Sequence, residues 1–169
     1  MYFDVGIDFR DKIVEHKGVA MSENQETSAK RRPWHMWVVG VLGLLWNAMG
    51  AMDYIMTETR NEAYLSSFSP EQLEFFNSFP AWVVASWATA VWGGVLGALL
   101  LLFRRRLAVP VFLVSLVAML ITTFHNFVLS NGLEVMGDGF ALGFTVVIFL
   151  VSLGLLLYSC AMRQRGVLV

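Results

Sequence analysis

The chain alternates between four long apolar runs and shorter polar segments. The first run covers residues 34–56 and carries no charge before Asp53. A helix of that length rises roughly 34 Å, which is enough to cross the hydrocarbon core of a bilayer with some tilt. Runs of similar length follow at residues 81–103, 107–129 and 139–162. The pattern therefore predicts an all-α, membrane-embedded bundle of four transmembrane helices.

The first predicted helix has two different faces. At about 100° per residue, small and polar residues share one side and large apolar residues the other. In lipid, helices associate through close packing of small residues and through polar contacts. We therefore expect the first set to face other helices and the second set to face acyl chains. The inward set is Gly40, Gly43, Trp46, Asn47, Gly50, Asp53 and Tyr54, and the outward set is Val38, Val41, Leu45, Met49, Met52 and Met56.

Small residues recur four apart along the second predicted helix. Two parallel rows run through Gly93 and Gly94, and the spacing from Gly93 to Gly97 is typical of closely packed membrane helices. Gly43 and Gly50 on the first helix are expected to serve packing in the same way. The partner helix could belong to the same chain or to a second copy, so a homo-oligomer is one interpretation.

The connection between the first two predicted helices, residues 57–80, is acidic and also rich in aromatic side chains. Ser69 is a good helix cap, Pro70 fits the first helical position, and Gln72 can complete a capping box. The sequence predicts a short helix over about residues 70–78, lying in the membrane interface with its carboxylates in water. A plain solvated loop is the alternative.

Basic residues define the expected topology. Eight of the twelve Lys and Arg fall in clusters at residues 30–32, 104–106 and 163–165, which lie on one side of a four-span bundle. Because cytoplasmic loops near membrane spans are enriched in Lys and Arg, this side is expected to be cytoplasmic. Residues 1–33 and 163–169 are then cytoplasmic tails, the first predicted to be disordered. Met21 resembles a translation start, so residues 1–20 are expected to be an upstream extension or poorly ordered.

Composition limits the classes of partner that the chain is expected to bind. The chain is 57% hydrophobic and 15% charged, with a net charge of −1, which gives no basic field for nucleic acid. The lipid bilayer is the expected partner, and any small-molecule ligand is left open. The one cysteine, Cys160, excludes an intrachain disulfide and a cysteine metal cluster. We expect no cofactor and no metal site.

Ionisable residues inside a membrane are costly and are candidate functional residues by default. Asp53 and His125 are expected near the outer ends of the first and third helices, at similar depth, with Asn126 and Tyr54 close by. Such a group could hold a proton, bind a cation or line a polar vestibule, or Asp53 and His125 could simply tie two helices together. Asn47 lies deeper and is expected to hydrogen-bond between helices.

Several enzymatic interpretations fail on the residues available. His35 and His125 are expected at opposite membrane faces, which prevents one chain from using them as paired haem ligands. No serine, histidine and aspartate share one depth with a plausible nucleophile, and no glycine-rich phosphate loop follows a strand. We therefore predict a protein that is not an enzyme.

From Trp34 onward the chain resembles a group of small, uncharacterised four-span bacterial membrane proteins, some of which carry the label sugar transporter. The resemblance implies four membrane spans and a location in the bacterial inner membrane, and it supplies no site residues. It rests on Leu45-Trp46-Asn47 with Gly50 and Asp53-Tyr54, on Phe79-Pro80-Ala81-Trp82, on Gly93-Gly94 with Gly97, and on Leu99 to Arg106 leading to Pro110-Val111-Phe112.

Two functions from different classes follow from these features. The glycine rows favour an accessory or structural membrane protein that acts through helix packing. Asp53, His125 and Asn47 favour a small-solute or proton-linked transporter, which would need a homo-oligomer because four spans rarely enclose a solute path alone.

Overall fold

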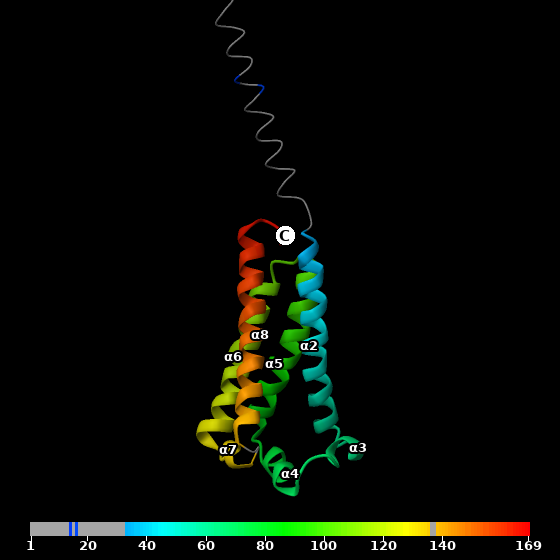
Figure 1. Cartoon of the computed structure of the whole chain (residues 1–169), viewed down its shortest axis with the longest axis vertical. Coiled ribbons are helices and arrows are strands. Elements are labelled where there is room, and N and C mark those ends of the chain that lie inside the picture. The colour runs from blue at the N-terminus through cyan, green and yellow to red at the C-terminus, as the bar shows by residue number, and fades with distance from the viewer. Residues whose placement is uncertain (1–13, 15, 17–32, 136–137) are drawn as a thin grey trace, which may run out of the picture.

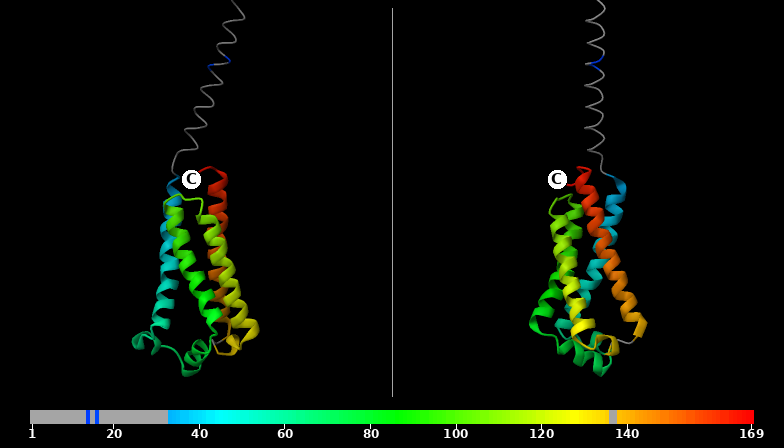
Figure 2. Two further views of the ribbon diagram at one scale, coloured as in Figure 1. Left: turned by 180° about the vertical axis from the view of Figure 1, so that it is seen from behind. Right: turned by 90° about the vertical axis from the view of Figure 1, so that its left-hand side faces the viewer.

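Four long helices dominate the chain and lie side by side as an antiparallel bundle (Figures 1 and 2). The computed structural model describes residues 14, 16, 33–135 and 138–169, so the tail predicted over residues 1–33 lies almost wholly outside it. All four helices are long and apolar enough to cross a membrane. They are α2 (Trp34–Glu58), α5 (Ala81–Leu102), α6 (Ala108–Phe124), which continues into the π-helical turn η1 (His125–Leu129), and α8 (Asp138–Gln164). The prediction of an all-α chain with four such helices is confirmed.

Glycines set how closely the helices approach one another. A β-carbon built on Gly97 would lie 2.7 Å from the Phe112 ring of α6, and one on Gly93 would lie 3.0 Å from Ser115. Helix α5 therefore packs on α6 along this glycine row. On its other side, Gly94 leaves room for Asn47 of α2. The predicted row Gly93-x-x-x-Gly97 thus finds its partner helix within the same chain.

The glycines of α2 differ in how closely they let side chains of the neighbouring helices approach. A β-carbon on Gly40 would lie 2.5 Å from Leu102 of α5, and one on Gly43 would lie 2.9 Å from Leu155 of α8. The sequence also predicts Gly50 as a packing residue. A β-carbon built there would lie 3.6 Å from Val91, an ordinary contact distance. The helices are therefore closest toward the beginning of α2 and looser toward its end.

The predicted faces of α2 are found in the structure. Gly40 and Gly43 are buried, and the remaining members of the inward set are half-buried. Met49, the most exposed member of the outward set, is 67% exposed, and of that set only Met56 is half-buried instead of exposed. The helical period was enough to orient this helix because its small and polar residues all fall on one arc.

The connection after α2 contains two short helices, α3 (Glu62–Leu65) and α4 (Pro70–Asn77). The predicted capping box of α4 is present: Gln72 N–H donates to the Ser69 hydroxyl at 3.2 Å, and Ser69 N–H donates to the Gln72 side chain at 3.0 Å. Helix α3 was not predicted. A third short helix, α7 (Gly132–Val135), lies in the connection between η1 and α8.

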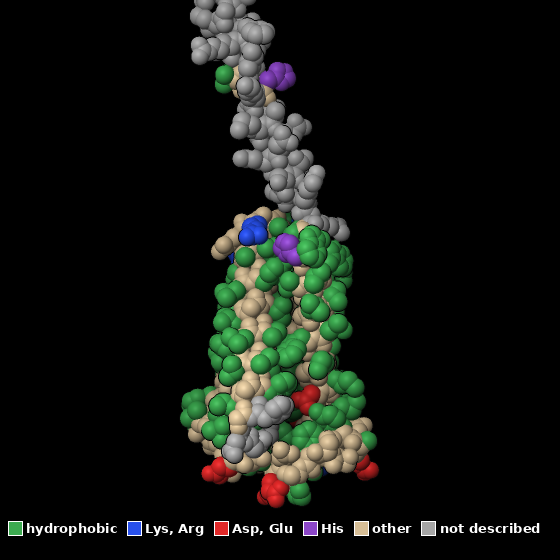
Figure 3. Space-filling view, in the orientation of Figure 1, with side chains coloured by type: hydrophobic (Ala, Val, Ile, Leu, Met, Phe, Trp, Pro, Cys, Tyr) green, Lys and Arg blue, Asp and Glu red, His purple; other side chains and the backbone are tan. Residues whose placement is uncertain are grey.

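Most charged side chains of the described residues separate by sign to opposite ends of the bundle, with Arg60 as the exception among the acidic residues (Figure 3). We call them the arginine-rich end, with Arg104, Arg105, Arg106, Arg163 and Arg165, and the acidic end, with Glu58, Glu62, Glu71, Glu74 and Glu134. The main hydrophobic core lies in the arginine-rich half, around fully buried Met36, Ala98 and Leu101. The acidic half is less filled because α8 packs mainly on α6 and only slightly on α2.

Residues 163–169, predicted as a tail, instead complete the arginine-rich end. Helix α8 continues to Gln164, and Gly166 turns the chain back with a φ of +67°. The returning segment pairs with the link between α5 and α6, since Val169 N–H donates to Arg104 C=O at 2.7 Å and Arg106 N–H donates to Val169 C=O at 3.1 Å. Leu168 is fully buried beneath this pairing.

Candidate functional site

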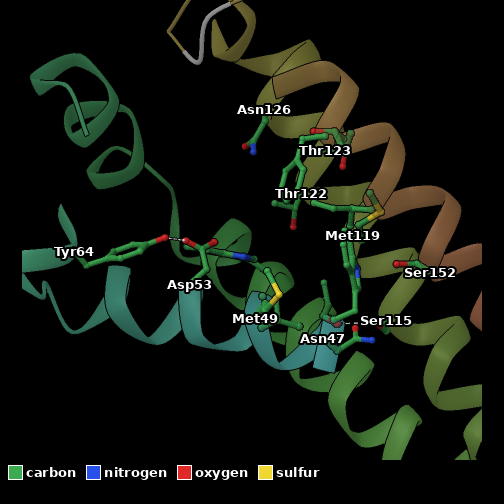
Figure 4. A pocket seen from close by; sticks show the side chains of 18 residues that line it. Asn47, Met49, Asp53, Tyr64, Ser115, Met119, Thr122, Thr123, Asn126 and Ser152 are labelled. Carbon is green, nitrogen blue, oxygen red and sulfur yellow. Dashed lines mark hydrogen bonds between the residues drawn. The ribbon is translucent and has the colours of Figure 1, made fainter. Parts of the chain in front are cut away.

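A cavity of about 480 Å³ lies in the acidic half of the bundle, where α2, α5, α6 and α8 meet (Figure 4). Half of its lining side chains are polar and most of the rest are aromatic or thioether groups. The lining residues are Trp46, Asn47, Met49, Gly50, Asp53, Tyr64, Trp87, Ala90, Val91, Ser115, Met119, Thr122, Thr123, Asn126, Phe144, Thr145, Ile148 and Ser152. A cavity that combines apolar and aromatic walls with polar groups can hold a small molecule that has both characters.

Helical spacing brings the polar residues to the cavity. On α2, Asn47, Gly50 and Asp53 follow at intervals of three and therefore share one face. On α6 and η1, Ser115, Met119, Thr122 and Asn126 follow at alternating intervals of four and three, which also keeps them on one face. Two long helices thus each present a polar stripe to the same space.

The Asp53 carboxylate lies at the cavity wall and accepts a hydrogen bond from the Tyr64 hydroxyl (Figure 4). Tyr64 belongs to α3, whose first turn is capped by Asn61: the Asn61 side chain accepts a hydrogen bond of 3.0 Å from Tyr64 N–H. Tyr64 was not among the site residues predicted from the sequence. The only local signal was the Asn61 cap, which predicts a helix start but not what the tyrosine contacts.

His125 does not pair with Asp53. Its Nε2 lies 3.3 Å from the Ser130 hydroxyl, and its Nδ1 lies 3.3 Å from the Asn126 side-chain oxygen. Its ring is enclosed edge-on by Phe79 and Trp82, with ring centroids 5.6 and 5.2 Å away. The expected Asp53–His125 group is therefore divided: Asp53 lines the cavity, whereas His125 joins the aromatic connection at the acidic end.

The other predicted residues fall into two groups. Asn47 and Asn126 line the cavity. Asn47 was expected to hydrogen-bond between helices, but its amide donates at 2.7 Å to Gly43 C=O of its own helix. Tyr54 does not line the cavity, and its ring instead packs edge-on against Trp87 at 5.0 Å.

Several cavity residues were not singled out from the sequence. Ser115, Thr123 and Ser152 are small polar residues in strongly apolar helices, a common occurrence that does not by itself indicate a site. The heptad-like spacing of Ser115, Thr122 and Asn126 was the available signal. It could not be interpreted without knowing which helix faces that stripe.

Three hydroxyl groups of the lining donate their protons to backbone carbonyls. Ser115 donates to Ala90 C=O at 2.6 Å, linking α6 to α5, while Thr122 and Thr145 donate within their own helices at 3.1 and 2.9 Å. Since a hydroxyl has one proton and two acceptor lone pairs, these groups present acceptors to the cavity. The wall is therefore rich in hydrogen-bond acceptors.

Burial and the hydrogen bond to Asp53 raise the pH at which the Tyr64 hydroxyl ionises. Desolvation, followed by the hydrogen bond to Asp53 and its charge, raises the pKa of Tyr64 from 10.0 to about 12. Folding thus favours the protonated phenol, whose contribution to stability is complete below pH 10 and is lost as the pH rises through about 12.

We expect the ultraviolet phenolate titration to lose its highest-pH step in Tyr64→Phe, and that step to move to lower pH in Asp53→Asn. An unchanged midpoint in Asp53→Asn would contradict the contact.

Comparison with protein-family models, curated proteins and solved structures finds no match for this chain. The resemblance to small four-span bacterial membrane proteins therefore stays a prediction.

Proposed function

We propose that this chain is a multi-pass membrane protein that binds a small amphipathic molecule in the acidic half of its helix bundle. We propose that it is a carrier for this molecule and not an enzyme. The cavity of about 480 Å³, enclosed by four apolar helices, is the observation that carries the proposal. Its volume falls within the range of small-molecule sites, roughly 300–1,000 Å³.

The proposed orientation follows from charge. The arginine-rich end lies in the cytoplasm and the acidic end faces outward across a bacterial inner membrane, as the distribution of Arg and Lys near the spans favours. Helix α4 then lies in the outer interface, with Phe76 and Phe79 among the lipid headgroups. The cavity opens in the outer half of the membrane under this arrangement.

With the helix contacts known, the glycine rows support a purely structural role less than the sequence alone suggested. Gly93, Gly94 and Gly97 each contact side chains of the same chain, so their spacing no longer calls for a second copy. One observation still favours self-association as a second candidate: β-carbons built on Gly139, Gly143 and Gly154 of α8 would meet no atom within 4 Å among the described residues. A detergent-solubilised mass of a single chain would rule this candidate out.

Blocking the cavity tests the proposal. The purified full chain in maltoside detergent is screened by tryptophan fluorescence and thermal stabilisation against small amphipathic amines, carboxylates and uncharged molecules. We expect at least one class to bind and to alter the fluorescence of Trp46 or Trp87, which line the cavity. Ser152→Phe, which places a ring in the cavity, should abolish that binding.

Val147→Phe is the matched control, because Val147 lies on the same helix, is 44% exposed and does not line the cavity. It should leave binding intact. Absence of binding by every class, or equal binding in Ser152→Phe and wild type, would refute the proposed function.

A further inference from the structure

We propose that the molecule held in this cavity is a small organic cation, an alkylammonium group on an apolar body, and that the Asp53 carboxylate is its counter-ion. The inference rests on the proposed function and narrows it to one ligand class. Three independent properties of the lining carry it: its charge, its hydrogen-bonding character and its aromatic side chains.

The lining carries one acidic side chain and no basic one. Asp53 is the only carboxylate among the cavity residues, and neither Lys, Arg nor His lines the wall. Within the described part of the chain, the side-chain partner of Asp53 is the neutral hydroxyl of Tyr64. Asp53 is half-buried, and a carboxylate at this position without a cation is costly, so a ligand of opposite charge would offset part of that cost.

The acceptor-rich wall suits the same ligand. Ser115, Thr122 and Thr145 direct their hydroxyl protons to backbone carbonyls and leave oxygen lone pairs for the cavity. Lone pairs favour a ligand that donates hydrogen bonds or carries positive charge. An anionic ligand would be repelled by the Asp53 carboxylate, and no cation in the lining would offset that repulsion.

Aromatic rings complete the recognition. Trp46, Trp87 and Phe144 line the cavity, and the Trp46 and Phe144 rings lie 6.3 Å apart between α2 and α8. Aromatic faces attract alkylammonium groups by about 0.5–2 kcal/mol, which corresponds to roughly 2- to 30-fold in affinity. Rings and methionine side chains also provide the apolar surface that the ligand body needs.

The cation could be a soluble amine or the ammonium headgroup of a lipid. Both sources are compatible with the position of the cavity, since Met49 and Phe144 belong to its wall and are also 67% and 50% exposed on the bundle surface. The shared chemistry is an ammonium group beside an apolar segment, and the test below separates the two sources.

A pair of probes with one shape and different charge tests the inference. Phenyltrimethylammonium has a fixed positive charge, and tert-butylbenzene is its uncharged carbon analogue. Binding of each to the full chain in maltoside detergent is measured at equal free concentration. We expect the cation to bind at least about tenfold more tightly, as a charge pair at the effective dielectric of a protein would give.

Two variants assign the effect to Asp53. Asp53→Asn keeps the shape of the side chain and should lower the affinity for the cation at least about tenfold, while the affinity for tert-butylbenzene changes less than about twofold. Glu58→Gln is the matched control: Glu58 is an exposed acid on the same helix, outside the cavity, and its screened charge should matter less than about twofold.

The outcomes separate the two proposals. Equal affinity for both probes, or a cation affinity unchanged in Asp53→Asn, with binding still blocked by Ser152→Phe, overturns the cation inference and leaves the carrier proposal standing. Binding of neither probe overturns the cation inference, and the proposed function falls as well only if every class in the ligand screen also fails to bind. Where the cation binds as expected, competition by phosphatidylethanolamine but not by phosphatidylglycerol assigns it to a lipid headgroup, and lack of competition by either assigns it to a soluble amine.

Discussion

Leu168→Ala is expected to lower the free energy of unfolding by about 2–5 kcal/mol, the usual range when a fully buried leucine is truncated and a cavity remains. Leu168 has no exposed surface and packs in the main core with Met36, Leu101 and Met162. It lies at the arginine-rich end, beyond the apolar length of the helices. In water, unlike in lipid, burial of a leucine is itself strongly favourable.

The measurement is unfolding of the purified protein in mixed maltoside and dodecyl sulfate micelles, followed by helical circular dichroism. Val169→Ala is the matched control, because its side chain is 63% exposed while its backbone makes the same pairing with the Arg104–Arg106 link. It should change stability by less than about 0.5 kcal/mol. Equal, small effects of the two substitutions would mean that the returning segment does not hold the bundle together.

Gly94→Val is the second change with a large expected effect. A β-carbon at Gly94 would overlap the Asn47 amide, which holds its position by donating to Gly43 C=O at 2.7 Å. Overpacking of this kind costs typically about 1–3 kcal/mol. We expect a fall of that size in the same unfolding assay, with α2 moved away from α5.

A double-mutant cycle identifies the cause. Asn47→Ala removes the clashing amide, so the cost of Gly94→Val should fall by at least about 1 kcal/mol in the Asn47→Ala background. Gly154→Val, at an exposed glycine with open space around it, serves as the control and should be nearly neutral. Equal costs of Gly94→Val in the two backgrounds would exclude Asn47 as the neighbour that matters.

Features that depend on local spacing could be predicted from the sequence. The four long helices, the inward face of α2 and the capping box at Ser69 all follow from patterns within one segment. The amphipathic arc of α2 was informative because glycines and polar residues share it, whereas α8 is apolar almost all round and gave no such orientation.

Contacts between distant segments could not be predicted in the same way. Residue positions gave the depth of Asp53 and His125 and the inward face of Asp53, but not the direction of His125 around its helix axis, and so suggested a pair that the fold separates. Tyr64 reaches Asp53 only because a short helix folds back beside α2. The docking of Leu168 likewise depends on a left-handed turn at Gly166 and on the link between α5 and α6.

The short link between α5 and α6 has a consequence for biogenesis. Residues 103–107 are a short link, and α5 and α6 form the most extensive packing in the bundle. Under the proposed membrane location, we expect these two helices to insert together as one hairpin. Under the proposed function, helix α8 is synthesised after the other three and supplies the last wall of the cavity, so a nascent chain acquires binding competence only after α8 has been made.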